Sequence, residues 1–229
     1  MRAVNGVLKR IWPTFESCKS LIESESAIRR ALLDGRGKAE LLNQEKTMAR
    51  QAIWQTIART SPKQLIAGYT ELIQQRIDEG FSAFLLTFMF KQLAGPPKAL
   101  LMQMNDEVQR VYSTFVTRVV RNPRSEFLKD ALPVLITVPD RPVCKKNKQN
   151  LSDLTINGGL HLHGILCVPR KSRLKVDAAA HFNANKDLYV KNRLLRIDIK
   201  PVYSEGVVDY AFKALKNGSA TADDIQVYH

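Results

Sequence analysis

The feature that most constrains the fold is a change of hydrophobic pattern at Phe81. Before it, apolar residues recur every three or four positions, as in amphipathic helices. From there the apolar and β-branched run FSAFLLTFMF predicts a buried strand, and residues 98–120 return to a helical spacing. The later segments predict strands at 132–138, 159–169 and 194–203 and a helix at 207–218. This order, β, α, β, β, β, α, predicts an α+β fold, an antiparallel sheet flanked by helices on one side.

The residues before the sheet are predicted to form a separate helical region. Apolar spacing indicates helices at 14–33, 38–59 and 62–79. Ser61-Pro62 has the N-cap residue and first-turn proline typical of a helix start. The predicted domains are therefore a helical N-terminal region, 1–79, and a domain, 80–229, that contains the sheet. The N-terminal helices suit either a DNA-reading appendage or plain scaffolding.

Positive charge is unevenly distributed along the chain. The formal net charge is +13, and residues 141–200 alone hold 13 basic and 4 acidic side chains, a net +9, against a net +6 for residues 1–140. Clustered Lys and Arg gain affinity for a phosphate backbone by releasing its counterions. The excess indicates a polyanionic partner, although a solvated basic face would have the same composition. A membrane partner is not expected, because no basic amphipathic helix carries Trp or Phe on its apolar side.

The cysteines and the apolar runs indicate the cellular compartment. Cys18, Cys144 and Cys167 have neither the even number of a disulfide framework nor a metal-ligand spacing, so we expect unpaired thiols in a reducing environment. The start of the sequence has no apolar signal-peptide region, and the longest apolar run, 81–90, is too short to cross a bilayer. These features predict a soluble, cytoplasmic protein.

His161 and His163 form the most informative pair in the sequence. Alternate residues of a strand point to the same side, so both imidazoles should converge on one face, where they can bind a divalent ion. Leu162 should point the other way, into the core, and Gly164 leaves room for backbone or substrate to approach closely. Two partly exposed strand histidines without a metal are an equally simple interpretation.

Tyr210 lies away from the apolar stripe of the last predicted helix. That stripe consists of Val208, Ala211, Phe212 and Leu215. Tyr210 and Lys213 are three residues apart on the opposite side, where the ammonium can stabilise a developing phenolate or hold a phosphate oxygen. A phenol needs such help, or a metal, to attack a phosphodiester near neutral pH. The alternative is an ordinary surface helix with an exposed tyrosine and lysine.

Together these motifs resemble the HUH superfamily of single-strand nucleases, and within it the single-tyrosine rolling-circle replication initiators. Three motifs occur in the family's order: Leu86-Thr87-Phe88 near the end of a hydrophobic strand, the two-histidine strand HLHGIL, and Tyr210-Ala211-Phe212-Lys213 on a helix. The resemblance covers about residues 80–218. It implies a ferredoxin/RRM-like core and an enzyme that nicks single-stranded DNA to start rolling-circle replication of a plasmid, phage or integrated element.

The resemblance also implies a role for each candidate residue. His161 and His163 would coordinate Mg²⁺ or Mn²⁺, with Asp140 as the preferred third ligand and Asp153 as its rival. Tyr210 would attack the scissile phosphate, leaving a covalent 5′-phosphotyrosine and a free 3′-hydroxyl. Lys213 would orient the phosphate or the tyrosine. The implied enzyme is a metal-dependent DNA endonuclease and strand transferase.

The partner implied by the resemblance is single-stranded DNA or an origin hairpin. The sequence contains no Gly-rich phosphate loop with Lys-Ser/Thr, so we expect unwinding by a host helicase and extension by a host polymerase. The main alternative is a DNA-binding module of the same fold that does not cleave. A transposase or relaxase of the superfamily is less expected, because transposases usually carry glutamine at the position of Lys213 and relaxases an N-terminal tyrosine.

Overall fold

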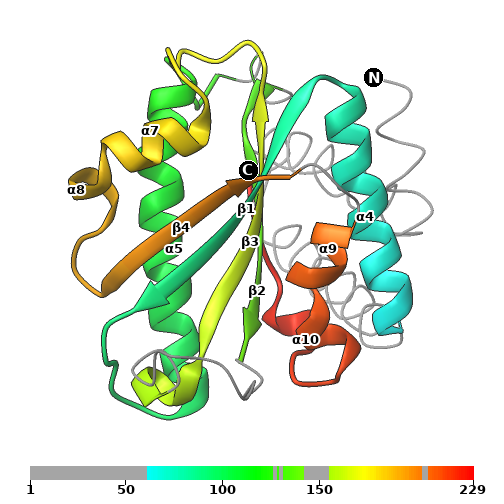
Figure 1. Ribbon diagram of the computed structural model, residues 1–229, viewed down its shortest axis with the longest axis vertical. Helices are drawn as coiled ribbons and strands as arrows, with labels where there is room; N and C mark the ends of the chain where they lie inside the picture. Colours follow the sequence, from blue (N-terminus) through cyan, green and yellow to red (C-terminus); the bar gives the residue numbers. More distant parts are fainter. Residues whose placement is uncertain (1–60, 126–127, 129–130, 142–154, 203–205) are drawn as a thin grey trace, which may run out of the picture. The chain divides into compact units, whose positions relative to one another are not determined.

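The computed structural model describes residues 61–229 apart from 126–127, 129–130, 142–154 and 203–205 (Figure 1). Outside these ranges lie the helices predicted at 14–33 and 38–59 and the residues Cys18, Cys144 and Asp153. The chain divides into two compact units, Met1–Leu72 and Ile73–His229. The sheet and the candidate site both belong to the second unit, and the domain boundary after residue 79 stays a prediction.

Five antiparallel strands form one sheet in the order β4-β1-β3-β2-β5. The strands are β1 (Phe81–Phe90), β2 (Val134–Asp140), β3 (His161–Pro169), β4 (Leu194–Pro201) and β5 (Gln226–Tyr228). All of β3 is buried, because it is the middle strand and both of its faces are covered. The predicted α+β class is confirmed, as are the four predicted strands. The sequence pattern does not predict β5, since three residues are too few to show a period.

Helices follow the sequence pattern where the pattern is long. The described helices and 3-10 turns are α4 (Pro62–Asp78), α5 (Pro97–Val119), η2 (Ile156–Gly159), α7 (Ala178–Ala184), α8 (Lys186–Tyr189), α9 (Gly206–Ala211), α10 (Lys213–Lys216) and η3 (Ala222–Asp224). The prediction for α5 is confirmed within one residue at each end. The helix predicted at 207–218 is wrong in one respect: it divides into α9 and α10, because Phe212 leaves helical geometry (φ −97°, ψ 13°).

Helices cover both faces of the sheet, so the prediction of helices on one side is wrong (Figure 1). On one face, here called the α5 face, Leu162 and Leu166 share a hydrophobic core with residues of α5 and α7. On the other, the histidine face, α9 contacts β3 and α10 contacts β2. The reason lies in β3, where Ile165 and Cys167 point away from the α5 face and are also buried. Leaving these apolar side chains in water would cost hydrophobic free energy.

Candidate metal centre and active site

Three buried polar side chains meet on the histidine face, where β2 pairs with β3. Asp140 lies opposite His161 in the antiparallel register, and His163 lies two residues further along β3. Directly opposed residues of an antiparallel pair share a face, and so do alternate residues of one strand. The pairing therefore brings the Asp140 carboxylate, the preferred third ligand, together with both imidazoles.

The donor atoms of this cluster form a nearly equilateral triangle. Nε2 of His161 and Nε2 of His163 are 3.3 Å apart and lie 3.4 and 3.3 Å from Oδ2 of Asp140. Edges of 3.3–3.4 Å place each corner about 1.9 Å from the centre, close to the roughly 2.0–2.2 Å bonds that imidazole nitrogen and carboxylate oxygen make to a dication such as Zn²⁺. All three side chains are buried. The group can therefore hold a metal ion.

Hydrogen bonds on the far ring nitrogens orient both histidines. Nδ1 of His161 lies 2.9 Å from the carbonyl oxygen of Gly159. A carbonyl only accepts, so this Nδ1 carries the proton, and Nε2 of the neutral ring keeps its lone pair. Nδ1 of His163 lies 3.1 Å from Oγ1 of Thr87, a hydroxyl that can accept or donate. When Thr87 accepts, Nε2 of His163 is likewise free to bind a cation.

Asn157 holds the turn before the histidine strand in place, and the sequence analysis did not identify it as a site residue. It adopts a left-handed backbone conformation (φ 54°) in the turn before β3. Its Nδ2 donates to the carbonyl of Lys91 at 2.9 Å, and its Oδ1 accepts from the N–H of Leu93 at 2.8 Å. These bonds tie the end of β1 to the turn that carries the Gly159 carbonyl. The sequence feature that could have predicted this turn is Asn-Gly-Gly just ahead of the histidine strand, because Asn and Gly tolerate a left-handed backbone conformation.

The protonation states of the cluster suit metal binding. Burial raises the pKa of Asp140, but its interactions with His161, His163 and the Lys213 ammonium outweigh burial and hold that pKa well below its usual range. Burial lowers the pKa of His163, and the charges of His161 and Lys213 add to this, while Asp140 acts in the opposite direction. At neutral pH the carboxylate is therefore charged and His163 is neutral, the forms that bind metal ions.

Tyr210 and Lys213 reach the same cluster from the helices that cover the histidine face. The ring centroids of Tyr210 and His163 are 5.1 Å apart, and Tyr210 is 49% exposed. Nζ of Lys213 lies 2.7 Å from Oδ2 of Asp140 and 4.8 Å from the centre of the Tyr210 ring. The structure thus brings together the residues named for catalysis with the three named for metal binding. Their roles stay predictions.

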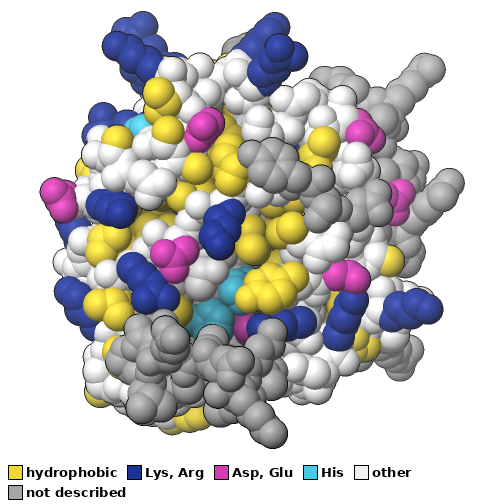
Figure 2. Space-filling model, viewed as in Figure 1, with side chains coloured by type: hydrophobic (Ala, Val, Ile, Leu, Met, Phe, Trp, Pro, Cys, Tyr) yellow, Lys and Arg dark blue, Asp and Glu magenta, His cyan; other side chains and the backbone are white. Residues whose placement is uncertain are grey.

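The surface around the cluster carries charge. In Figure 2, histidine side chains lie in a hollow of the visible face, with hydrophobic, acidic and basic side chains around them. On the edge strand β4, Arg196 and Asp198 lie on the histidine face, because Asp198 pairs with Thr87 and Thr87 pairs with His163. Nε of Arg196 lies 3.0 Å from Oδ2 of Asp198. A charged edge strand, β4, is therefore separated from the two-histidine strand β3 only by β1.

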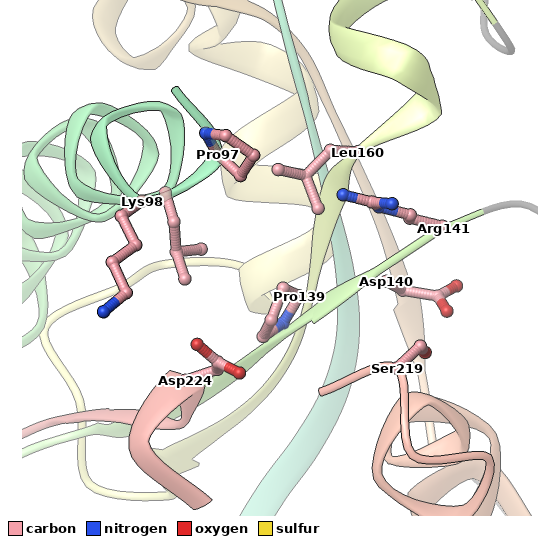
Figure 3. Close-up of a pocket in the computed structure, with 9 residues that line it drawn as sticks. Pro97, Lys98, Pro139, Asp140, Arg141, Leu160, Ser219 and Asp224 are labelled. Carbon is pink, nitrogen blue, oxygen red and sulfur yellow. The ribbon is translucent and has the colours of Figure 1, made fainter. Parts of the chain in front are cut away.

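A pocket opens beside the cluster at the end of β2 (Figure 3). It is lined by Pro97, Lys98, Leu101, Pro139, Asp140, Arg141, Leu160, Ser219 and Asp224. Of the three cluster residues only Asp140 is among these lining residues, and Figure 3 shows its carboxylate pointing away from Pro97 and Lys98. Gly164 also differs from expectation: the side chains of Leu135 and Phe88, and not a substrate, approach it closely.

Cys167 and His181 lie away from the cluster. The Cys167 thiol is free, as predicted, and burial raises its pKa to about 12, so it is a poor metal ligand and nucleophile. His181 belongs to α7, and its Nε2 lies 2.8 Å from the hydroxyl of Tyr189. His181 therefore has a structural partner within the α5-face layer.

None of the helices in the described part of the chain is long and apolar enough to span a membrane. No protein-family model matches the sequence, and neither a curated protein nor a solved structure matches the chain. The function is therefore inferred from the geometry of the site.

Proposed function

We propose that this protein is a metal-dependent endonuclease of the HUH type, which nicks single-stranded DNA through a covalent 5′-phosphotyrosine and so initiates rolling-circle replication of a plasmid, phage or integrated element. One observation carries the proposal: an exposed tyrosine lies beside a buried cluster of two histidines and one carboxylate. Tyr210 and His163 come from segments 47 positions apart, yet their rings are 5.1 Å apart. A tyrosine kept for packing would not be half exposed beside a metal-ligand set.

In this mechanism Asp140, His161 and His163 would hold Mg²⁺ or Mn²⁺. The bound ion would polarise the scissile phosphate and neutralise charge on it. Oη of Tyr210 attacks the phosphorus and loses its proton to solvent, the new bond joins Oη to phosphorus, and the bond from phosphorus to the 3′-oxygen breaks. That oxygen takes up a proton and becomes the free 3′-hydroxyl. Lys213 lies close enough to Tyr210 to orient the phosphate as this exchange occurs.

The donor set favours Mn²⁺ over Mg²⁺ in this proposal. Two of the three protein ligands are imidazole nitrogens, and Mg²⁺ strongly prefers oxygen ligands and retained water. Affinity of a nitrogen and oxygen site rises along the first transition row from Mn²⁺. We therefore expect lower Mn²⁺ than Mg²⁺ concentrations to support the same rate.

DNA is the proposed substrate because the chain is strongly basic and the tyrosine is accessible. The net charge of +13 favours phosphate backbones, and Lys and Arg side chains are scattered over the visible face that contains the histidine side chains (Figure 2). Host proteins would supply the helicase and the polymerase.

The test uses single-stranded oligonucleotides carrying a label at either the 5′ or the 3′ end. Full-length protein with Mn²⁺ is expected to become covalently attached to the 3′-labelled fragment and to release a 5′-labelled fragment that a polymerase can extend. Tyr210→Phe should abolish the adduct. Tyr228→Phe is the matched control, because Tyr228 is buried and its hydroxyl lies 3.4 Å from the carbonyl of Asn105, in contact with α5.

The outcomes separate the alternatives. DNA binding without an adduct in any metal would leave a non-cleaving DNA-binding module of the same fold. An adduct that forms only on transposon-end or transfer-origin sequences would favour a transposase or relaxase. An adduct that persists in Tyr210→Phe would refute the assigned nucleophile.

A further inference from the structure

Lys213 occupies an unusual position for a residue whose proposed partner is DNA. Its ammonium lies 2.7 Å from Oδ2 of Asp140, the oxygen that also faces Nε2 of His161 and Nε2 of His163. Both oxygens of this carboxylate are buried, and neither has a well-aligned hydrogen bond among the described residues, so Lys213 contacts Oδ2 as an ion pair. Lys213 is thus the only full positive charge that the described residues place within ion-pair distance of this carboxylate.

A divalent cation held by the cluster needs the same oxygen. The triangle of donor atoms includes Oδ2, and a buried carboxylate oxygen already bound to a dication is a poor partner for an ammonium, because the two cations would repel each other at short range. Two positive groups therefore compete for one buried oxygen. The side chain of Lys213 is 30% exposed and flexible, so it has room to move, whereas the ligands are fixed on strands.

The alternative location for the ammonium is the side of Tyr210. Lys213 already lies 4.8 Å from the centre of the Tyr210 ring, and Tyr210 is half exposed. A small rotation of the lysine side chain would carry the charge from the carboxylate toward the open surface beside the phenol, where a phosphodiester would bind.

We propose that Lys213 is an internal counterion that competes with the divalent cation for Asp140, and that cation binding releases its ammonium toward Tyr210. Lys213 is therefore a positioning residue with two alternative partners. This inference rests on the metal-binding part of the proposed function and is independent of DNA cleavage. It implies an order of binding, cation first and phosphate second, because the ammonium is not available to a phosphate until the carboxylate has another partner.

The first measurement is Mn²⁺ affinity without DNA, by calorimetry at one pH and ionic strength. Lys213→Met should bind Mn²⁺ about tenfold more tightly than the wild type, the lower end of what a hydrogen bond to a charged group contributes. Lys216→Met is the matched control: it removes an ammonium of the same helix whose partner, Asp209 at 2.7 Å, is exposed. The control should leave Mn²⁺ affinity unchanged within about twofold.

The second measurement uses the wild-type protein and follows lysine acylation by mass spectrometry. An ammonium in an ion pair with a buried carboxylate reacts slowly, so saturating Mn²⁺ should raise the acylation rate of Lys213 several-fold relative to Lys216. A Lys213→Met variant that binds Mn²⁺ with unchanged or weaker affinity, or a Lys213 rate that Mn²⁺ does not raise, would overturn the exchange. If neither the wild type nor Lys213→Met binds any divalent ion, both the exchange of Lys213 and the metal centre are overturned. If Mn²⁺ releases Lys213 but the protein does not cleave DNA, only the nuclease proposal is overturned.

Discussion

The two faces of the central strand β3 bury polar groups in different ways. On the α5 face, two polar side chains each have a partner of their own: the hydroxyl of Tyr112 donates to the carbonyl of Pro133 at 2.7 Å, and His181 faces the hydroxyl of Tyr189 at 2.8 Å. On the histidine face, three nitrogens converge on one oxygen of Asp140, and neither oxygen of that carboxylate has a well-aligned hydrogen bond among the described residues.

This difference separates structural polar groups from functional ones. One donor for one acceptor fixes a side chain and satisfies it, which is how buried polar groups normally stabilise a fold. Several nitrogens around one charged oxygen leave bonding capacity unused, and imidazole lone pairs that face the carboxylate repel its charge, an arrangement that a cation would relieve. The histidine face therefore resembles a binding site, and the α5 face resembles a core.

The largest expected effect comes from neighbouring residues on β3 that point to opposite faces. Leu162 is fully buried in the α5-face core, so Leu162→Ala should lower the free energy of unfolding by about 2–5 kcal/mol. His163→Ala should lower it by roughly 1 kcal/mol without metal and should remove most Mn²⁺ affinity. Urea unfolding and Mn²⁺ calorimetry on both variants measure the contrast. Equal losses of stability would break the division between the faces.

A second comparison concerns Gly164, the next residue of β3 on the α5 face. A Cβ atom there would lie 3.0 Å from Cδ1 of Leu135 and 3.3 Å from Cε2 of Phe88. Gly164→Ala should therefore destabilise the fold by about 1–3 kcal/mol through overpacking. Mn²⁺ affinity of the folded variant should stay within about threefold of wild type, because the donor atoms lie on the other face. Thermal unfolding without Mn²⁺ measures the loss of stability, and the shift that Mn²⁺ causes measures the retained affinity. Loss of Mn²⁺ binding in Gly164→Ala would show that packing on the α5 face affects the metal site.

The sequence predicts this division only in part. The alternation of side chains along a strand is enough to place His161 and His163 on the same side of β3. It also places Ile165 and Cys167 on the histidine side, and apolar side chains on both sides of a strand indicate a cover on both faces, a signal that the prediction of helices on one side did not use. The choice of Asp140 over Asp153 depends on how β2 pairs with β3, a register set by packing between segments far apart in sequence.

The interactions that fine-tune the site are also beyond sequence patterns. Thr87 belongs to a vague motif, and its hydrogen bond to His163 exists only because β1 pairs with β3 in one register. The ion pair of Lys213 with Asp140 joins a short helix to a strand end more than seventy positions earlier. Such contacts follow from the assembled sheet, and no local period predicts them.

Thr87 offers a smaller test on the histidine face. Thr87→Val removes the hydroxyl that lies 3.1 Å from Nδ1 of His163 while keeping a similar shape. Loss of a partner that orients a metal-binding histidine typically weakens metal affinity by about 10-fold or more, and we expect that change with little loss of stability. Thr114→Val is the control, because it removes a hydroxyl that bonds only within α5, to the carbonyl of Arg110. Equal Mn²⁺ affinity in the two variants would contradict the positioning role of Thr87.

The smallest expected effect is the pH dependence contributed by His181 on the α5 face. Burial lowers its pKa, and the positive charge of Arg118 adds to this. The unfolded chain, with an ordinary histidine pKa of about 6.5, then takes up a proton at higher pH than the folded chain does. The contribution of neutral His181 is therefore fully present above about pH 6.5 and is lost as the pH falls from there through the lower pKa of the folded protein. His181→Gln keeps a side chain able to bond the Tyr189 hydroxyl but cannot titrate, so the stability advantage of the wild type should shrink between about pH 7.5 and 5.5. Urea unfolding across that range measures this difference in stability between wild type and variant. The difference should be the same with and without Mn²⁺, because His181 and the metal ligands lie in different layers. A difference that changes with Mn²⁺ would mean that the two faces of the sheet are energetically coupled.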